Sequence, residues 1–199
     1  MIRHRNTEKR QPRLPFLLAA KQINYLLLTV MTFSVEWVDT AEGLQGSQII
    51  NLPFADMRID RRGDVIVSAD WLLSADPVTK MQADATMTSD WLECWQQADK
   101  STSLKLLKQG TCYQFKVWQA LLKIPFGHTM TYKALALQIG SGARAIGNAC
   151  KKNPYPLIIP CHRIVAAHGL GGYSGETQGD LVAIKRKLLA AEAMFKYVS

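Results

Sequence analysis

The spacing of apolar residues predicts short strands in the first part of the chain. From about residue 35 to residue 73, apolar and polar residues alternate in short runs, as on strands with one buried face. Residues 47–52 form one candidate strand. Residues 57–59 and 65–67 flank residues 60–64, whose sequence Asp-Arg-Arg-Gly-Asp favours a tight turn. This stretch is therefore predicted to be a β-hairpin.

After the hairpin the pattern is weaker and becomes helical. Residues 74–88 are small and polar, which indicates a loop. Ser89 or Asp90 can cap a short helix in the apolar stretch that follows. A second helical segment is expected around residues 103–108, and it ends at Gly110 because glycine commonly terminates helices.

Beyond this point the helical periodicity becomes clear. Tyr113, Val117 and Leu121 recur every four residues, which gives one apolar face of an amphipathic helix. The segment Ile-Pro-Phe-Gly at residues 124–127 ends that helix.

Two short helices follow, joined by a turn that contains glycine. Thr131 caps the first, at residues 132–139, and Gly140 closes it. The second covers residues 143–152 and carries Arg144 with two lysines at its end. Helix, turn and helix in this order are typical of a DNA-binding motif, although helical hairpins are also common packing units. Small residues on the second helix permit close approach to a partner backbone or to another helix: Ala143, Ala145, Gly147 and Ala149.

The segment around Cys161 carries the candidate chemistry. Residues 157–159 are apolar and lie between Pro156 and Pro160, which predicts a short buried strand that leads to the cysteine. His162 and Arg163 follow directly, and such neighbours lower a thiol pKa and favour the nucleophilic thiolate. The alternative is an ordinary buried cysteine. The glycine-rich loop at residues 169–175 could line a pocket above the thiol.

The last predicted element is a helix from residue 181 to about residue 197, with Asp180 as its cap. Its apolar stripe consists of Ile184, Leu188, Ala191 and Phe195. Lys185 and Glu192 lie seven residues apart on one face beside that stripe. They are either solvated charges or, in the case of Glu192, a catalytic partner for His162.

Charge is divided unevenly along the 199 residues, whose net charge is +8. Residues 101–199 carry 13 Lys and Arg against three acidic residues, whereas residues 1–100 carry 11 basic and 13 acidic residues. The excess of positive charge in the second half favours a polyanionic partner such as nucleic acid. A solvated lysine-rich surface is the alternative interpretation.

The cysteines and histidines argue against a disulfide framework and give no support to a metal site. The four cysteines are Cys94, Cys112, Cys150 and Cys161, and no two of them have a CxxC spacing. That usage favours a reducing compartment. The four histidines are too scattered to complete a zinc module with them, so no metal is expected.

Residues 14–33 are largely apolar and follow a basic stretch, as in a signal peptide or membrane anchor. Lys21, Gln22 and Asn24 interrupt the run, so it lacks the roughly 18 consecutive apolar residues that a membrane span needs. Met31 is an equally good start, with residues 1–30 as an extension. We therefore expect a soluble protein.

Many of these residues occur together in the O6-alkylguanine-DNA alkyltransferases, also called methylated-DNA–protein-cysteine methyltransferases, and the chain resembles that family over residues 110–192. The Pro-Cys-His-Arg segment between Asn-Pro and Gly-Tyr is the most specific part of the resemblance. The matching positions are Gly110-Thr111, Gln114, Val117-Trp118, Ile124-Pro125, Gly127, Thr129, Thr131-Tyr132, Leu135-Ala136, Arg144-Ala145-Ile146-Gly147, Ala149, Asn153-Pro154, residues 159–165, Gly172-Tyr173, Gly175, Lys185, Leu188-Leu189 and Glu192.

The resemblance implies an α/β (α+β) fold in two domains. Residues 1–105 would form a small sheet-containing, ribonuclease H-like scaffold domain. Residues 106–199 would form a mostly helical domain, with a helix-turn-helix, that binds DNA and accepts the alkyl group. The family acts on O6-alkylguanine, and on O4-alkylthymine, in double-stranded DNA after flipping the damaged base out of the stack. The resemblance further implies a cytoplasmic monomer that needs no cofactor, binds no membrane and reacts once.

The resemblance also assigns roles to individual residues. Cys161 would accept the alkyl group, His162 would take its proton through a water, and Glu192 would orient His162. Asn153 would hold the cysteine segment in place. The substrate-binding residues would be Tyr132, Ser174 and Lys185. The DNA-binding residues would be Arg144, which replaces the flipped base, with Ala143, Gly147 and Lys151 on the same helix.

Two segments depart from the family pattern. The turn at residues 140–144 is shorter than usual by about a dipeptide, and the link at residues 176–180 is longer and more acidic. The link is expected to border the pocket and to affect the size of the substrate it accepts. Other functions considered are a non-catalytic protein that binds alkylguanine and recruits repair factors, a methylation-sensing DNA-binding regulator, and a cysteine hydrolase.

Overall fold

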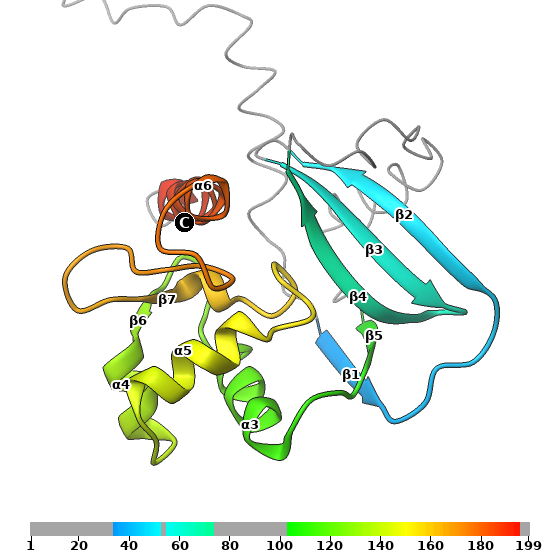
Figure 1. The fold of residues 1–199 in the computed structure, drawn as a ribbon, viewed down its shortest axis with the longest axis horizontal. Helices are drawn as coiled ribbons and strands as arrows, with labels where there is room; N and C mark the ends of the chain where they lie inside the picture. Colours follow the sequence, from blue (N-terminus) through cyan, green and yellow to red (C-terminus); the bar gives the residue numbers. More distant parts are fainter. Residues whose placement is uncertain (1–33, 53–54, 74–102, 196–199) are drawn as a thin grey trace, which may run out of the picture.

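The structure, a computed structural model, describes residues 34–52, 55–73 and 103–195. These residues form a five-stranded sheet and a mostly helical part that lie side by side (Figure 1). Several expectations fall outside the described residues: the extension and start near Met31, the loop at residues 74–88, the helix after Ser89, and the position of Cys94.

The sheet consists of β1 (Ser34–Val38), β2 (Gln45–Asn51), β3 (Asp56–Arg62), β4 (Val65–Leu72) and β5 (Ser103–Leu107), in the order β1-β5-β4-β3-β2. The pairs β2–β3 and β3–β4 are antiparallel, and β5 is parallel to both β1 and β4. The predicted hairpin between β3 and β4 is confirmed, with Gly63 at a positive φ of 57° in its turn. The predicted strand at residues 47–52 is confirmed as β2.

The helix expected around residues 103–108 is wrong, because these residues form β5. Leu104 and Leu106 are buried and alternate with more exposed neighbours, which is a strand period of two. The partner strand β1 lies about 70 residues earlier in the chain, so local sequence could not show the pairing. β5 also runs across residue 105, the domain boundary expected from the sequence.

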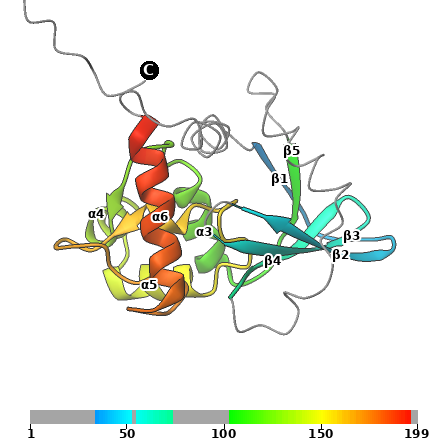
Figure 2. The same ribbon diagram turned by 90° about the horizontal axis from the view of Figure 1, so that it is seen from above.

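The helical part contains α3 (Cys112–Leu121), α4 (Tyr132–Gln138), α5 (Ala143–Lys151) and α6 (Asp180–Phe195), together with the short strands β6 (Met130–Thr131) and β7 (Ile164–Val165). The sequence predicted all four helices. Thr111 caps α3 in a capping box with Gln114, and the Thr131 hydroxyl accepts the Ala134 N–H at the start of α4. α6 is seen end-on in Figure 1 and lengthwise in Figure 2. The α/β fold class, with a sheet followed by a mostly helical part, is confirmed.

The strand expected at residues 157–159 is wrong. Leu157 has a positive φ of 73°, and only an isolated bridge joins Pro156 to Ile159. Prolines on both sides lack the N–H that a strand ladder needs, so the segment folds back on itself, with the Ile159 N–H donating to the Tyr155 carbonyl at 2.8 Å. Cys161 therefore begins a 3₁₀ turn, Cys161–Arg163, rather than following a strand.

Strand β4 extends beyond its pairing with β5 and contacts the helical part directly. The Gln109 amide donates to the Val67 carbonyl at 2.8 Å, and the Ala69 N–H donates to the Pro154 carbonyl at 2.9 Å. The Trp71 indole N–H donates to the Tyr173 hydroxyl at 3.0 Å. Three polar contacts from one strand thus fix the sheet against the segments that surround Cys161. Within the described ranges, no helix has both the length and the apolar character needed to cross a bilayer.

Candidate functional site

Cys161 lies at a pocket of about 300 Å³ between α4, α5 and the loop before α6. The parallel pairing of β6 with β7 places the 3₁₀ turn beside the start of α4. This pairing explains why Tyr132, the first residue of α4, and Cys161 face the same space. The thiol side chain is only 2% exposed. The pocket is lined by Tyr132, Gly147, Asn148, Cys150, Lys151, Cys161, Gly172, Tyr173, Ser174, Gly175, Glu176 and Thr177.

Asn153 fixes the position of the sulfur. Its amide nitrogen donates to the Cys161 Sγ at 3.2 Å and to the Ile159 carbonyl at 3.0 Å. Its amide oxygen accepts the Tyr155 N–H at 3.0 Å. One side chain thus contacts both ends of the folded segment that precedes the cysteine.

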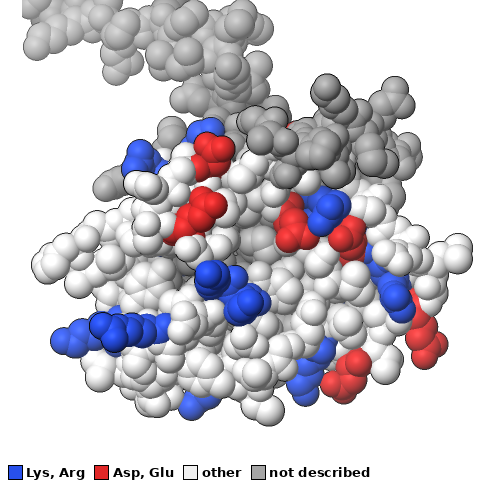
Figure 3. Space-filling view, viewed as in Figure 1, with Lys and Arg blue, Asp and Glu red and all other residues white. Residues whose placement is uncertain are grey.

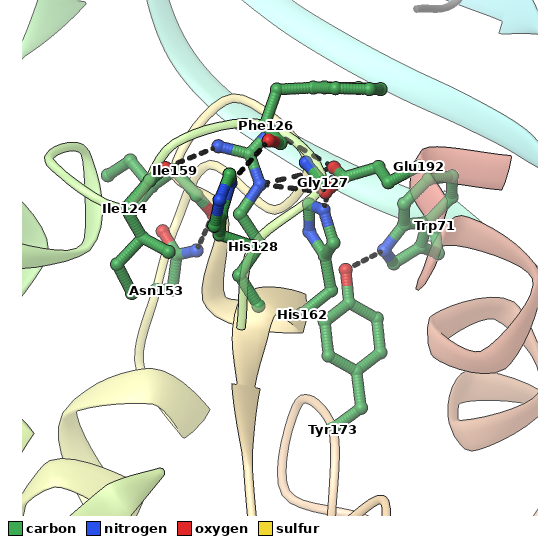
Figure 4. A network of polar contacts seen from close by, with 11 residues as sticks. Trp71, Ile124, Phe126, Gly127, His128, Asn153, Ile159, His162, Tyr173 and Glu192 are labelled. Carbon is green, nitrogen blue, oxygen red and sulfur yellow. Dashed lines mark hydrogen bonds and ion pairs between the residues drawn. The ribbon is translucent and has the colours of Figure 1, made fainter. Parts of the chain in front are cut away.

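His162, the residue after Cys161, forms a buried pair with Glu192 (Figure 4). The His162 Nε2 lies 2.8 Å from the Glu192 Oε1, and because a carboxylate only accepts, Nε2 carries the proton. In neutral His162, Nδ1 is then the nitrogen with the free lone pair. Nδ1 is buried and has no hydrogen-bond partner within the described structure. In this orientation Nδ1 is the nitrogen of His162 that can accept a proton.

Arg163 completes the surroundings of Glu192, a role that sequence reasoning missed. Its guanidinium donates to both carboxylate oxygens of Glu192 at 3.0–3.1 Å and to the Ile124 carbonyl at 2.8 Å. The Gly127 N–H adds a further donor at 3.1 Å (Figure 4). The adjacency of Arg163 to His162 was the only sequence signal, and it was interpreted as acting on the thiol instead.

The pKa shifts follow from burial and from these contacts. Burial raises the pKa of Cys161, although the Asn153 hydrogen bond and the charge of Lys185 oppose the rise. The expectation that its neighbours make Cys161 a ready thiolate is therefore wrong, since Arg163 is turned toward Glu192. Burial lowers the pKa of His162, against the effect of Glu192. Burial raises the pKa of Glu192, but its bonds from His162 and Arg163 lower it to about 2. Both the raised pKa of Cys161 and the lowered pKa of His162 favour the neutral forms of the two groups.

Of the predicted substrate-binding residues, Tyr132 and Ser174 line the pocket, whereas Lys185 lies outside its lining. The Tyr132 hydroxyl donates to the Gly172 carbonyl at 3.3 Å. Lys185 is fully buried and donates to the same carbonyl at 2.9 Å and to the Ile164 carbonyl at 2.6 Å. It therefore fixes the glycine loop and β7 from behind the pocket. Burial lowers the pKa of Lys185 to about 8.

The predicted DNA-binding residues separate along α5. Gly147 and Lys151 line the pocket, whereas Ala143 and Arg144 lie exposed at the start of the helix. In Figure 3 the charged side chains over α4 and α5 are basic, whereas basic and acidic side chains are mixed over the sheet and near α6. Neither helix contains an acidic residue. The surface that these two helices form is therefore basic.

Further residues at the site come from segments that the sequence analysis left without a role. Tyr173 and Cys150 line the pocket, and Trp71 contacts Tyr173 from the sheet. The acidic link was expected to border the pocket, and Glu176 and Thr177 do line it. Across the described ranges, no three His, Cys, Asp or Glu side chains gather as a metal site would require.

Comparisons with known proteins agree with this geometry. Residues 112–194 match the family model described as 6-O-methylguanine DNA methyltransferase, DNA binding domain. A mimivirus protein from Acanthamoeba polyphaga mimivirus, named "Probable methylated-DNA--protein-cysteine methyltransferase", is 48% identical over 79 residues, which are 39% of this chain and 53% of that protein. The chain thus spans about half the length of the curated relatives it matches.

The likeness to solved structures extends over more of the chain. The crystal structure of the Mycobacterium tuberculosis O6-methylguanine methyltransferase is 33% identical, with a TM-score of 0.60, over 76% of this chain and 94% of that one. The structure of Mycobacterium tuberculosis OGT in complex with DNA is 32% identical, with a TM-score of 0.57, over 74% and 93% of the two chains. These matches include the sheet as well as the helical part.

Proposed function

Because the chain belongs to the methylated-DNA–protein-cysteine methyltransferase family, we propose that it repairs DNA by transferring the alkyl group of O6-alkylguanine to Cys161. The observation that carries the proposal is the arrangement around the sulfur. Cys161 faces the pocket, accepts a hydrogen bond from Asn153, and lies next to a histidine held as a base by Glu192. O4-alkylthymine presents the same kind of alkylated oxygen and is proposed as a second substrate.

The transfer is a displacement at the alkyl carbon. The Cys161 proton passes through a water to the Nδ1 of His162, and the Nε2–H bond to Glu192 stabilises the imidazolium that forms. The thiolate sulfur then forms a bond to the alkyl carbon as the bond from that carbon to O6 breaks. The electron pair of the broken bond goes to the guanine ring. Tyr132 donates a proton or hydrogen bond to the ring and so improves the leaving group.

The base reaches the sulfur by leaving the duplex. A pocket of about 300 Å³ offers space for one extruded base rather than for a duplex. Arg144 is exposed at the start of α5, where it can occupy the place of the extruded base. Gly147 and Lys151 follow Arg144 along α5 and line the pocket, so we expect them to contact the DNA backbone beside the extruded base. We propose residues 106–199 as the domain that does this work and residues 1–105 as its scaffold.

The product on the protein is a thioether, which no group near Cys161 can cleave. Each chain therefore reacts once, as a monomer, and needs no cofactor because the sulfur itself is the acceptor. This feature distinguishes the proposal from a cysteine hydrolase, whose thioester intermediate is released by water.

Intact-mass measurement after incubation with a duplex that carries O6-methylguanine tests the proposal. We expect one gain of about 14 Da per chain, since a methyl group replaces the thiol hydrogen. The gain maps to the peptide with Cys161 and disappears in Cys161→Ser. Cys112→Ser removes an exposed cysteine at the start of α3 and is the matched control, which retains the full gain. Tight binding of the damaged duplex with no gain in mass would contradict the transferase proposal. It would indicate a non-catalytic recruiter or regulator instead.

A further inference from the structure

A buried hydrogen bond joins the sheet to the pocket that contains Cys161. The Trp71 indole N–H, on β4, donates to the Tyr173 hydroxyl at 3.0 Å, although the two residues are 102 positions apart (Figure 4). Tyr173 is 3% exposed and Trp71 is 8% exposed. Buried tyrosine and tryptophan side chains require partners for their polar atoms, and here each supplies the other.

The chemistry of the two groups fixes the direction of this contact. An indole N–H is only a donor, so the Tyr173 oxygen accepts from Trp71 and keeps its own proton for another acceptor. The group that it faces is the thiol of Cys161, because Tyr173 and Cys161 line the same pocket and the Tyr173 hydroxyl acts on the thiol pKa as a hydrogen-bond donor. The three side chains therefore form a directed series from indole to phenol to sulfur.

We infer that Trp71 is a positioning residue for the Cys161 nucleophile, because its indole N–H holds the Tyr173 hydroxyl in the orientation that donates to the sulfur. The inference rests on the proposed function only in taking Cys161 as the nucleophile. It gives the sheet a part in the chemistry beyond that of a scaffold, since Trp71 belongs to β4 and not to the alkyl-transfer domain.

The Tyr173 contact is one of several groups that act on the sulfur. Lys185 on α6 contributes a positive charge, and Asn153 contributes a hydrogen bond. Cys150 on α5 and Tyr132 on α4 also interact electrostatically with Cys161, and His162 is the neighbouring residue in the turn. Burial raises the pKa of Cys161, and the bonds from Asn153 and Tyr173 with the Lys185 charge oppose it. Loss of any one of these three should raise the thiol pKa further.

Trp71→Phe keeps an aromatic ring and removes the donor. Without it the Tyr173 hydroxyl can rotate or turn its proton elsewhere, so the thiolate loses part of its stabilisation. We expect the apparent pKa of Cys161 to rise and its reaction to slow about three- to tenfold below that pKa, the range expected for one hydrogen bond. Above the pKa the two proteins should react equally fast, because the thiol is then ionised in both.

The measurement is the rate at which iodoacetamide labels Cys161, followed on its own peptide by mass spectrometry from about pH 6 to about pH 10. The same profile is measured for methyl transfer from the duplex. Tyr173→Phe should shift both profiles at least as far, and Trp71→Phe should add nothing in that background. Trp37→Phe, which changes a tryptophan of β1 that packs on Phe115 and Tyr155, is the matched control and should leave the profiles unchanged.

An unchanged rate for Trp71→Phe at every pH below the thiol pKa, or a full additional effect in the Tyr173→Phe background, would overturn the inference. If Trp71→Phe does not fold, benzothienylalanine at position 71 keeps the shape of the indole and lacks only the N–H, and it should reproduce the shift. A wild-type protein that transfers no methyl group but shows the iodoacetamide shift would refute the proposed function and still support the role of Trp71.

Discussion

Glu192 is the residue whose ionisation the structure predicts to matter most for stability. Its carboxylate accepts the His162 Nε2–H, the Arg163 guanidinium and the Gly127 N–H, and its side chain is 8% exposed. These contacts lower its pKa to about 2 from an ordinary value of 4.5. At about 1.4 kcal/mol for each unit, the ionised carboxylate contributes about 3 kcal/mol to the free energy of unfolding at pH 7.

The sign of the pH dependence follows from the depressed pKa. The unfolded chain binds a proton at Glu192 near pH 4.5, whereas the folded protein binds it near pH 2, so stability is lost as the pH falls between these values. Relative to pH 7, the contribution of Glu192 to the free energy of unfolding falls by about 1 kcal/mol at pH 4 and by about 2 kcal/mol at pH 3. Glu192→Gln removes the charge and keeps the shape. It should cost about 3 kcal/mol at pH 7, and the difference from the wild type should shrink by the same amounts on acidification.

Urea unfolding of both proteins at pH 7, 4 and 3 measures this difference directly. Because Glu192 raises the pKa of His162 against the effect of burial, the titration of His162 differs between the two proteins, and the comparison is repeated with His162→Gln in both, which removes it. Glu176→Gln, in the exposed link before α6, is the matched control and should unfold like the wild type at each pH. A cost for Glu192→Gln that stays constant from pH 7 to pH 3 would show that shape, and not charge, explains the loss.

Three further changes test other parts of the site. Asn153→Ala removes the donor to Cys161 Sγ and the hydrogen bonds to Ile159 and Tyr155. Methyl transfer at pH 7 should therefore slow at least tenfold in single-turnover measurements, and the free energy of unfolding in urea should fall by about 1–3 kcal/mol. An unchanged rate would contradict the role assigned to Asn153. Gly172→Ala would place a Cβ 2.5 Å from the Glu176 carbonyl oxygen and should lower the melting temperature by several degrees. Gly147→Ala would place a Cβ 4.0 Å from the Tyr132 ring and should raise the free energy of unfolding by about 0.5–1 kcal/mol in calorimetry. The reverse order of stabilities would refute this packing argument. Arg144→Ala should slow repair of duplex DNA at least tenfold but leave the reaction with free O6-methylguanine unchanged, and equal effects on both substrates would mean that Arg144 does not replace the extruded base.

Local sequence was sufficient wherever a pattern repeats within one element. The hairpin between β3 and β4 and the helix α3 could be predicted because their alternation, turn residues and caps lie within a few residues of one another. β5 was missed because five residues are too few to show a strand period clearly. Its identity depends on pairing with β1, which is distant in the sequence.

The strand predicted before Cys161 was wrong for a different reason. Apolar residues between two prolines predict a buried strand, but Leu157 takes a left-handed backbone conformation that side chains of its size rarely adopt. The Asn153 side chain supports that conformation through its bond to the Tyr155 N–H. The apolar composition of the segment indicates that it is buried. It does not indicate which backbone conformation the segment adopts.

The residues of the candidate site that belong to the family motif could be predicted from the sequence. Cys161, His162 and Glu192 were named from the sequence, and the structure brings His162 to Glu192 at hydrogen-bond distance. Trp71 could not be found in this way, since a tryptophan in a strand ordinarily indicates only a core residue. Its contact with Tyr173 exists because two segments with unrelated sequence patterns meet in space.

The way β4 meets the helical part also bears on how the chain avoids aggregation. β5 pairs with β4 only at Val65 and Ile66, so the rest of that side would be an open sheet edge, a template for joining another chain. Gln109 and Pro154 occupy the Val67 carbonyl and the Ala69 N–H on that edge. The helical half therefore acts as an edge cap. A sheet domain produced by itself would expose this strand and would be prone to self-association, which favours folding of the two halves as one cooperative unit.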